Sequence, residues 1–197
     1  MQIILVRHGQ PDAEGHGPQY DPPISSRGQA QAAHVARVLA VEPITRLLSS
    51  GMARADMTAA PLANALGLPL VIDAGLGEVD RGGREYVGLD SIRQRGTAEW
   101  SRFMAGPLEY YGVDPVRFRA ETLAAFDAIL RSDDADTVAV FTHGFPINIL
   151  LAHVLGLDHD ARFVPSHASI TRLVGRALSQ LTVVSVNEHG HIPADLR

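Results

Sequence analysis

The sequence predicts an α/β fold built around a mostly parallel sheet. Two apolar runs, residues 3–6 and 137–141, have the composition of strands that are buried on both faces, which is typical of parallel sheets. Strand-like and helix-like segments also alternate along the chain. Because 197 residues can bury a sizeable core, we expect one domain over residues 1–197, with a helical insert at about residues 84–131.

Composition argues against several classes of function. The formal net charge of -5 disfavours a general binder of nucleic acid or of anionic membranes. No stretch approaches the ~20 apolar residues of a membrane span, and the first residues lack the basic region of a signal peptide, so we expect a cytoplasmic protein. The absence of cysteine excludes disulfides and a thiol nucleophile. All 17 basic residues are arginine, which excludes Schiff-base and Walker-A lysine chemistry.

The first half of the chain predicts two strand–helix pairs. A turn-rich loop, residues 10–24, follows the first strand, and Ser25 and Ser26 can then cap a helix over about residues 27–40. A short strand over residues 44–49 precedes a second helix, which we expect Pro61 to kink or restart. The positions of the first helix that we expect to be buried are Ala30, Ala33, Val38 and Leu39.

The second half begins with a short strand at residues 69–72, which we place near a sheet edge because it opens with proline. The remaining elements are expected in a fixed order. They are two or three helical segments, roughly over 91–104 and 114–131 with a link at 106–112, then the buried strand 137–141, an apolar helix at about 145–155, and strands at 169–174 and 181–187.

Cationic and acidic residues follow the predicted strands. Arg7 and His8 end the first buried strand, His143 follows the second, and each histidine precedes a glycine. Arg54 begins the second helix, and Glu78 lies in a glycine-rich acidic loop. Ligands of open α/β sheets bind at the carboxyl ends of the strands, where guanidinium and imidazole groups suit a phosphoryl anion. Because the whole chain is acidic, such a site is a local basic pocket.

These pieces, in this order, resemble the histidine phosphatase superfamily, also called the phosphoglycerate mutase-like family. The resemblance covers most of the chain and implies a three-layer α/β sandwich with a mostly parallel central sheet flanked by helices. The segments that carry it are residues 5–9, 26–30, 49–54 with 58–59, 76–78, 142–144, and 186–187 with His189 and His191.

The resemblance also implies catalytic roles. His8 would attack phosphorus and form a phosphohistidine, for which a neutral imidazole with a fixed tautomer is suited. Arg7, Arg54 and His143 would bind the phosphoryl group of the substrate and stabilise its charge during transfer. Glu78 matches the acid of the family and would protonate the leaving oxygen, then activate a water. The resemblance implies no cofactor and no metal.

Several further residues are either candidate site residues or ordinary surface and core residues. Asp80 is the second candidate for the acid. Arg81 and Arg84 are candidates for contacting a second anionic group of the substrate, although solvated helix faces explain arginines of this region as well. Trp100, Phe103, Tyr110 and Tyr111 either line a lid over the site or pack against the sheet.

Most of the remaining histidines do not show the paired spacing on one helix face that is typical of metal ligands. His16 lies in the long loop, either near the site or at the surface. His189 and His191 alternate along an extended segment, so a metal site there is a minor alternative. The histidines to which we assign no role are His34, His153, His159, His167, His189 and His191.

Two departures from the family favour a phosphatase over a mutase. Residues 10–12 are Gln-Pro-Asp, where mutases usually carry Glu-Thr and later a Trp-Asn pair, and the segment between Glu78 and His143 is shorter than the mutase insert. We therefore predict a metal-independent phosphomonoesterase whose partner is a small-molecule phosphate ester, with no nucleic acid and no membrane, and leave a homodimer open. Mutase-type phosphoryl transfer and a weakly active phospho-ligand-binding protein are the alternatives.

Overall fold

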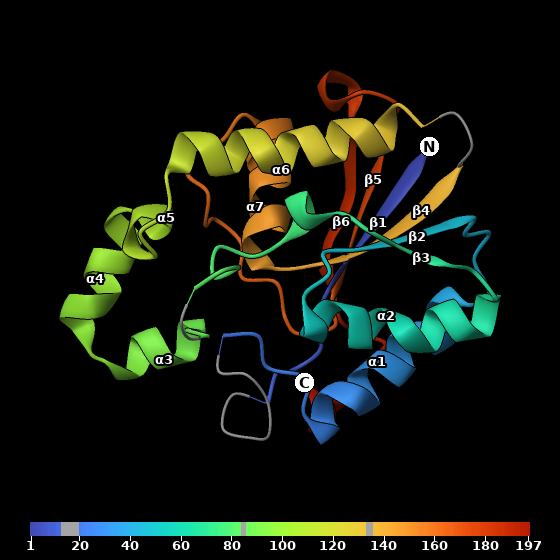
Figure 1. The fold of residues 1–197 in the computed structure, drawn as a ribbon, viewed down its shortest axis with the longest axis horizontal. Coiled ribbons are helices and arrows are strands. Elements are labelled where there is room, and N and C mark those ends of the chain that lie inside the picture. The colour runs from blue at the N-terminus through green and yellow to red at the C-terminus, as the bar shows by residue number, and fades with distance from the viewer. Residues whose placement is uncertain (13–19, 84–85, 133–135) are drawn as a thin grey trace.

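The chain forms a three-layer α/β sandwich in a computed structural model that describes residues 1–12, 20–83, 86–132 and 136–197. The central sheet has the strand order β3-β2-β4-β1-β5-β6. Helices α1 and α2 cover one face and α6 and α7 cover the other, as Figure 1 shows. The predicted fold class is confirmed. The strands are β1 (Gln2–Arg7), β2 (Arg46–Ser49), β3 (Leu70–Ile72), β4 (Thr137–Thr142), β5 (Ile170–Val174) and β6 (Thr182–Glu188).

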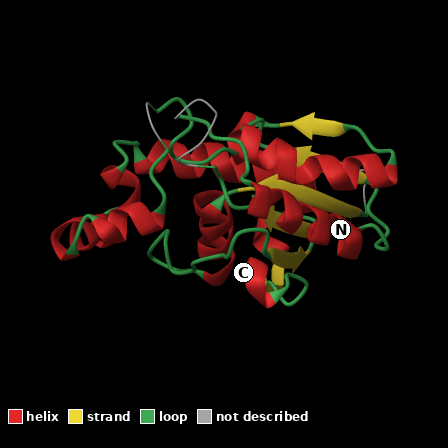
Figure 2. Cartoon of the chain, turned by 90° about the horizontal axis from the view of Figure 1, so that it is seen from below, coloured by secondary structure: helices red, strands yellow, loops and turns green. Residues whose placement is uncertain are grey.

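The helices fall into two groups by position. Those that cover the sheet are α1 (Ser26–Leu39), α2 (Ala53–Leu66), α6 (Pro115–Leu130) and α7 (Gly144–Leu155). Helices α3 (Leu89–Gln94), α4 (Thr97–Ala105) and α5 (Pro107–Tyr110) project beyond the strands, as Figure 2 shows. The 3-10 turns are η1 (Ala74–Leu76), η2 (Leu178–Gln180) and η3 (Ala194–Leu196).

The apolar run of β1 supplies both faces of the core. Successive side chains of a strand point to opposite faces of the sheet. Ile3 and Leu5 accordingly join the cluster under α6 and α7, whereas Ile4 and Val6 join the cluster under α1 and α2. All four side chains are fully buried, so β1 is a central strand, as the composition predicts.

Strand direction brings several chain segments to one edge of the sheet. Strands β1, β4, β2 and β3 are parallel, whereas β5 is antiparallel to both β1 and β6. Arg7 pairs with Thr142 at the ends of β1 and β4, so the next residues of both strands leave the sheet side by side. Because β5 runs the other way, it begins at the edge where β1 and β4 end.

Two glycines allow α1 to pack against the loop that follows β1. A Cβ on Gly9 would lie 2.7 Å from the carbonyl oxygen of Gly28, and a Cβ on Gly28 would lie 2.3 Å from that of Gln10. Both clashes would be with backbone, which cannot rotate away. Ser25 caps the helix by accepting a hydrogen bond from the Gly28 N–H.

The buried face of α1 differs from the expected one. Leu39 is buried, but Ala33 is exposed, and the face consists of Gly28, Gln31, Ala32, Val35, Ala36 and Leu39. Gln31 can be buried because its side chain accepts from the Gln10 N–H and donates to the Leu196 carbonyl. A polar residue whose hydrogen bonds are made inside the protein therefore lies on the buried face, and a search for apolar residues alone does not find it.

The restart of a helix at Pro61 and the single helix over residues 91–104 were wrong. Helix α2 continues through Pro61, because a proline removes one backbone hydrogen bond while the buried face, including Ala55, Ala59 and Leu62, stays packed. The alternative, a kink at Pro61, stays a prediction. The helix expected over residues 91–104 is instead the pair α3 and α4, separated at Gly96, whose φ of 104° is accessible mainly to glycine. The expected link at 106–112 contains the short helix α5.

The remaining element predictions agree with the structure to within a few residues. Asp114 caps α6 through the N–H groups of Val116 and Arg117, and β3 is an edge strand. Among the described residues, none of the helices combines the length and the hydrophobicity that a membrane span requires. The single domain over residues 1–197 stays a prediction.

Candidate active site

Three adjacent strands each place a histidine at the same edge of the sheet. His8 follows β1, His143 follows β4, and His167 precedes β5. The ring centroid of His8 lies 5.1 Å from that of His143 and 5.5 Å from that of His167. The nucleophile suggested by the sequence therefore sits between two other imidazoles.

His8 is held in one tautomer. Its Nδ1 lies 2.8 Å from the carbonyl oxygen of Gly9, and because a carbonyl can only accept, Nδ1 carries the proton. In the neutral ring, Nε2 then has a free electron pair. Burial, followed by the charge of Arg54, lowers the pKa of His8 well below its usual value, so the ring is neutral at physiological pH.

His143 is oriented by a serine of the β2–α2 connection. Its Nε2 lies 2.8 Å from Ser50 Oγ, which also accepts a hydrogen bond from the Met52 N–H. The serine hydroxyl can donate to Nε2 or accept from it, so this contact fixes the orientation of the ring and leaves its tautomer open. The Nδ1 of His143 is buried and bonds to no described residue. Burial also lowers the pKa of His143, with Arg54 as the next cause.

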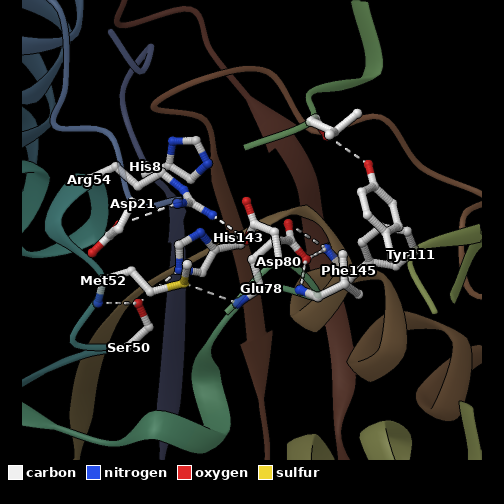
Figure 3. Close-up of polar contacts among 12 residues, drawn as sticks. His8, Asp21, Ser50, Met52, Arg54, Glu78, Asp80, Tyr111, His143 and Phe145 are labelled. Carbon is white, nitrogen blue, oxygen red and sulfur yellow. Dashed lines mark hydrogen bonds and ion pairs between the residues drawn. The ribbon is translucent and has the colours of Figure 1, made fainter. Parts of the chain in front are cut away.

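Arg54 is fully buried at the start of α2 and forms ion pairs with two carboxylates. Its Nη2 donates to Asp80 Oδ1 at 2.7 Å, and its Nη1 lies 3.4 Å from Asp21 Oδ1. Figure 3 shows both contacts beside the imidazoles. Asp21 also accepts from the Ala53 N–H and thereby caps α2. The Arg54 guanidinium carbon lies 5.0 Å from the ring centroid of Tyr86.

Arg7 adds a second guanidinium to this edge. It donates from Nη1 to the carbonyl of Pro165, just upstream of His167. Its charge contributes to lowering the pKa values of His8, His143 and His167, as expected for a cation near all three rings. We call His8, His143, Arg7 and Arg54 the edge cluster. The structure brings these four predicted residues together.

Glu78 lies in the loop after η1, and its side chain contacts the first turn of α7 beside the edge cluster. Both carboxylate oxygens lie 3.3 Å from the Phe145 nitrogen, and Oε1 accepts from the Val79 N–H at 3.0 Å. The loop that carries it is tied to the end of β4 by the Thr142 hydroxyl, which donates to the Leu76 carbonyl at 2.6 Å. Figure 3 shows the carboxylate between Asp80 and Phe145.

The pKa of Glu78 is raised from its ordinary 4.5 to about 7. Burial is the main cause and the Asp80 carboxylate the second, while Arg54 and the Val79 N–H act in the opposite direction. A carboxyl group with this pKa exchanges a proton readily near neutral pH, which is what a group acting as both acid and base requires. Asp80, the second candidate, is committed to Arg54 by its ion pair.

His167 was not predicted as a site residue. Its Nε2 is buried and bonds to no described residue, and burial lowers its pKa, with Arg7 the next cause. The next residue, Ala168, has a left-handed φ of 58°, unusual for a residue other than glycine. Its N–H is shared by the carbonyls of Arg7 and His8, each at 3.1 Å. This shared bond fixes the approach of His167 to His8.

The other candidate residues bond to groups outside the edge cluster or fall outside the described residues. Arg81 donates to Glu121 and to the Ala74 carbonyl, so it is engaged elsewhere. His16 and Arg84 fall outside the described residues. His189 and His191 bond through ring nitrogens to the carbonyls of Asn187 and Ala168. Within the described residues, no group of three or more His, Cys, Asp or Glu side chains is placed to hold a metal ion.

Arg7 lines two cavities, one apolar and one polar. The apolar cavity, of about 150 Å³, lies between the edge cluster and the helices α3–α5, and its walls include Trp100, Phe103 and Tyr111. The polar cavity, of about 730 Å³, lies on the side of α1 and is lined by His167, Arg27 and other polar residues. Tyr110, expected with the other aromatic residues, is bonded to Glu99 and is not among the residues that line the apolar cavity.

A family model described as the histidine phosphatase superfamily (branch 1) matches residues 3–189. The chain belongs to this superfamily. The resemblance carried by the sequence motifs is therefore confirmed at the level of the family.

Curated relatives of this superfamily include probable phosphoglycerate mutases GpmB. The protein from Enterobacter sp. (strain 638) is 27% identical over 182 residues, which cover 88% of this chain and 84% of the relative. The protein from Yersinia pestis (strain Pestoides F) is 30% identical over 175 residues, which cover 85% and 78% of the two chains.

Solved structures with the same fold include two named phosphatases. The mycobacterial glucosyl-3-phosphoglycerate phosphatase matches with a TM-score of 0.74 and 22% identity, over 95% of this chain and 99% of that one. The phosphoserine phosphatase of Entamoeba histolytica matches with a TM-score of 0.76 and 20% identity, over 98% and 99%. At these identities, the likeness shows the histidine phosphatase fold alone.

Proposed function

We propose that this histidine phosphatase superfamily member is a phosphomonoesterase that works through a phosphohistidine on His8. The observation that carries the proposal is the neutral His8 ring, whose unprotonated Nε2 belongs to a cluster with the guanidinium groups of Arg7 and Arg54 and the imidazole of His143. An electron pair facing positive charge suits attack on a phosphoryl group, whose negative charge those groups stabilise.

The first half-reaction forms the phosphoenzyme. His8 Nε2 forms a bond to phosphorus while the bond between phosphorus and the ester oxygen breaks. The protonated Glu78 gives its proton to the departing oxygen, so the products are an alcohol and a phosphohistidine. A pKa of about 7 keeps a large fraction of Glu78 protonated at neutral pH.

The second half-reaction returns the enzyme to its starting state. Glu78, now a carboxylate, takes a proton from water as the water oxygen bonds to phosphorus. The bond to Nε2 breaks and inorganic phosphate leaves. Because cations of the protein itself stabilise the charge, the proposal needs no metal ion, and EDTA should leave turnover unchanged.

The test is detection of the phosphohistidine. Brief incubation with a ³²P-labelled phosphate ester and a quench in base should leave acid-labile label on the wild-type protein and none on His8→Ala. His153→Ala, which changes an exposed histidine of α7, is the matched control and should be labelled normally. Wild-type turnover by His8→Ala would refute the assignment.

The named relatives favour one second candidate, a phosphoglycerate mutase. A phosphatase admits water to the phosphohistidine, whereas a mutase passes the group to a second hydroxyl. Incubation with 3-phosphoglycerate should therefore release free phosphate and glycerate if the proposal is right. Formation of the 2-phospho isomer with little phosphate release would favour the mutase, and tight binding without turnover of any ester would favour a phospho-ligand-binding protein.

A further inference from the structure

The apolar cavity adjoins both reacting groups. His8 and Glu78 are among its walls, so a leaving group that accepts a proton from Glu78 has this cavity beside it. Its volume of about 150 Å³ matches that of an engineered protein cavity which binds benzene. The large apolar side chains of its wall are Leu89, Trp100, Phe103, Met104, Tyr111, Phe145 and Phe163.

Two polar side chains of this wall, Asn148 and Tyr111, are engaged with the protein. Asn148 donates to the carbonyls of Gly144 and Phe163 and accepts from the Phe163 N–H. The Tyr111 hydroxyl donates to the Val87 carbonyl at 2.7 Å. A hydroxyl or amino group of a substrate would lose its water here and find few partners, which is unfavourable.

The charges of the wall disfavour a second anionic group on the leaving side. Glu78 and Asp80 line the cavity; Asp80 is the ion-pair partner of Arg54, and Glu78 repels a substrate carboxylate whenever it is ionised. Among the described residues of the wall, Arg7 is the only arginine, and it belongs to the edge cluster that faces the phosphoryl group. A bound carboxylate would therefore lose its hydration among aromatic rings, while the one arginine of the described wall faces the phosphoryl group.

We infer that the apolar cavity binds the leaving group, and that the preferred substrates are phosphate monoesters of uncharged apolar alcohols with an aryl or arylalkyl group. This inference rests on the proposed phosphomonoesterase activity. Sugar-acid and amino-acid phosphates are then poor substrates of this chain, whatever the names of its relatives.

Three alkyl esters separate binding in the cavity from leaving-group reactivity. The probes are 2-phenylethyl phosphate, ethyl phosphate and 3-phosphoglycerate, each of which releases an alkyl alcohol. Burial of one aromatic ring should raise kcat/KM for 2-phenylethyl phosphate by about 10- to 100-fold over ethyl phosphate. The value for 3-phosphoglycerate should fall below that for ethyl phosphate, because its carboxylate loses hydration.

A charge placed in the cavity should change this order. Met104 lies on α4 with 40% of its surface exposed, so Met104→Arg can be tolerated by the fold. It should lower kcat/KM for 2-phenylethyl phosphate by about 10-fold and raise that for 3-phosphoglycerate by a similar factor. Gln94→Arg adds the same charge at an exposed position that lines the polar cavity, and should leave the order of the three esters unchanged.

The outcomes distinguish this inference from the proposed function. If the esters are hydrolysed with a phosphohistidine but 3-phosphoglycerate is preferred, the inference is wrong and the phosphomonoesterase proposal survives. If Gln94→Arg rather than Met104→Arg changes the order, the leaving group lies in the polar cavity and the inference is again wrong. If none of the esters, nor 4-nitrophenyl phosphate, gives a phosphoenzyme, the proposed function itself fails.

Discussion

Glu78 shows how opposing interactions set the behaviour of a single residue. Backbone N–H groups of Val79 and Phe145 contact its carboxylate and favour the charged form. Burial and the nearby Asp80 favour the protonated form, and together they raise its pKa to about 7. The same contacts that position the carboxyl group beside His8 are therefore too weak to keep it ionised.

This pKa predicts a pH dependence of the first half-reaction. As the pH rises through about 7, Glu78 loses the proton that the leaving oxygen needs, so kcat/KM for an alkyl phosphate should fall. Glu78→Gln should lower kcat/KM for that ester by about 10²–10³ and abolish the falling limb. With 4-nitrophenyl phosphate, which needs little protonation, phosphoenzyme formation should suffer much less. A falling limb that persists in Glu78→Gln would assign the proton donor to another group.

The raised pKa also predicts a stability cost. Between about pH 4.5 and 7 the folded protein binds more protons at Glu78 than the unfolded chain does, so the free energy of unfolding falls as the pH rises through this window. Glu78→Gln mimics the protonated form. It should be about 1–3 kcal/mol more stable than the wild type at pH 8 and lose that advantage below pH 4.5. Urea unfolding at both pH values measures the difference, and equal stability at pH 8 would contradict the raised pKa.

Thr58 joins two elements that must be aligned for the chemistry. From α2, its Oγ1 accepts from the Gly9 N–H at 2.9 Å and donates to the Arg54 carbonyl at 2.7 Å. The Gly9 carbonyl in turn fixes the tautomer of His8. One hydroxyl therefore connects the helix that carries Arg54 to the end of the strand that carries His8.

Thr58→Val keeps the shape of this side chain and removes the hydroxyl. The buried N–H of Gly9 then lacks its partner, which should lower the free energy of unfolding by about 1–3 kcal/mol. Activity should fall as well, by about 10-fold in kcat, because the loop that orients His8 is released. Thr58→Ser retains the hydroxyl and should stay close to the wild type in kcat. Unchanged unfolding and kcat in Thr58→Val would show that this link is dispensable.

At the scale of the elements, local sequence patterns predicted which segments form helices and strands better than they predicted the residues at which those elements end. Ser25 and Asp114 are capping residues, and the helices they cap begin where expected. Gly96 ends a predicted helix because its positive φ is incompatible with an α-helix, and a hydrophobic pattern contains no information on φ. Pro61 fails to break another, since tertiary packing outweighs the one hydrogen bond it removes.

At the scale of the molecule, strand direction decides which residues the sequence could reveal. Parallel strands bring their carboxyl ends together, so residues after β1 and β4 could be grouped from the sequence alone. His167 precedes its strand, and a parallel β5 would place it at the opposite edge. Only the antiparallel pairing of β5 with β1 brings it to His8. Asp21 was missed because it lies in the irregular segment between β1 and α1, whose path no periodic pattern specifies.

The edge cluster and much of the apolar wall belong to different parts of the molecule. The edge cluster stands on strand ends and the start of α2, inside the sandwich, whereas Leu89, Trp100, Phe103 and Met104 come from helices that project beyond it. Substitutions in those helices can accumulate over generations without disturbing the nucleophile or its cations. A duplicated gene can thus acquire a new substrate by drift in a peripheral region while it inherits an intact catalytic apparatus. Solved structures of the same fold carry the names of phosphatases for different phosphate esters.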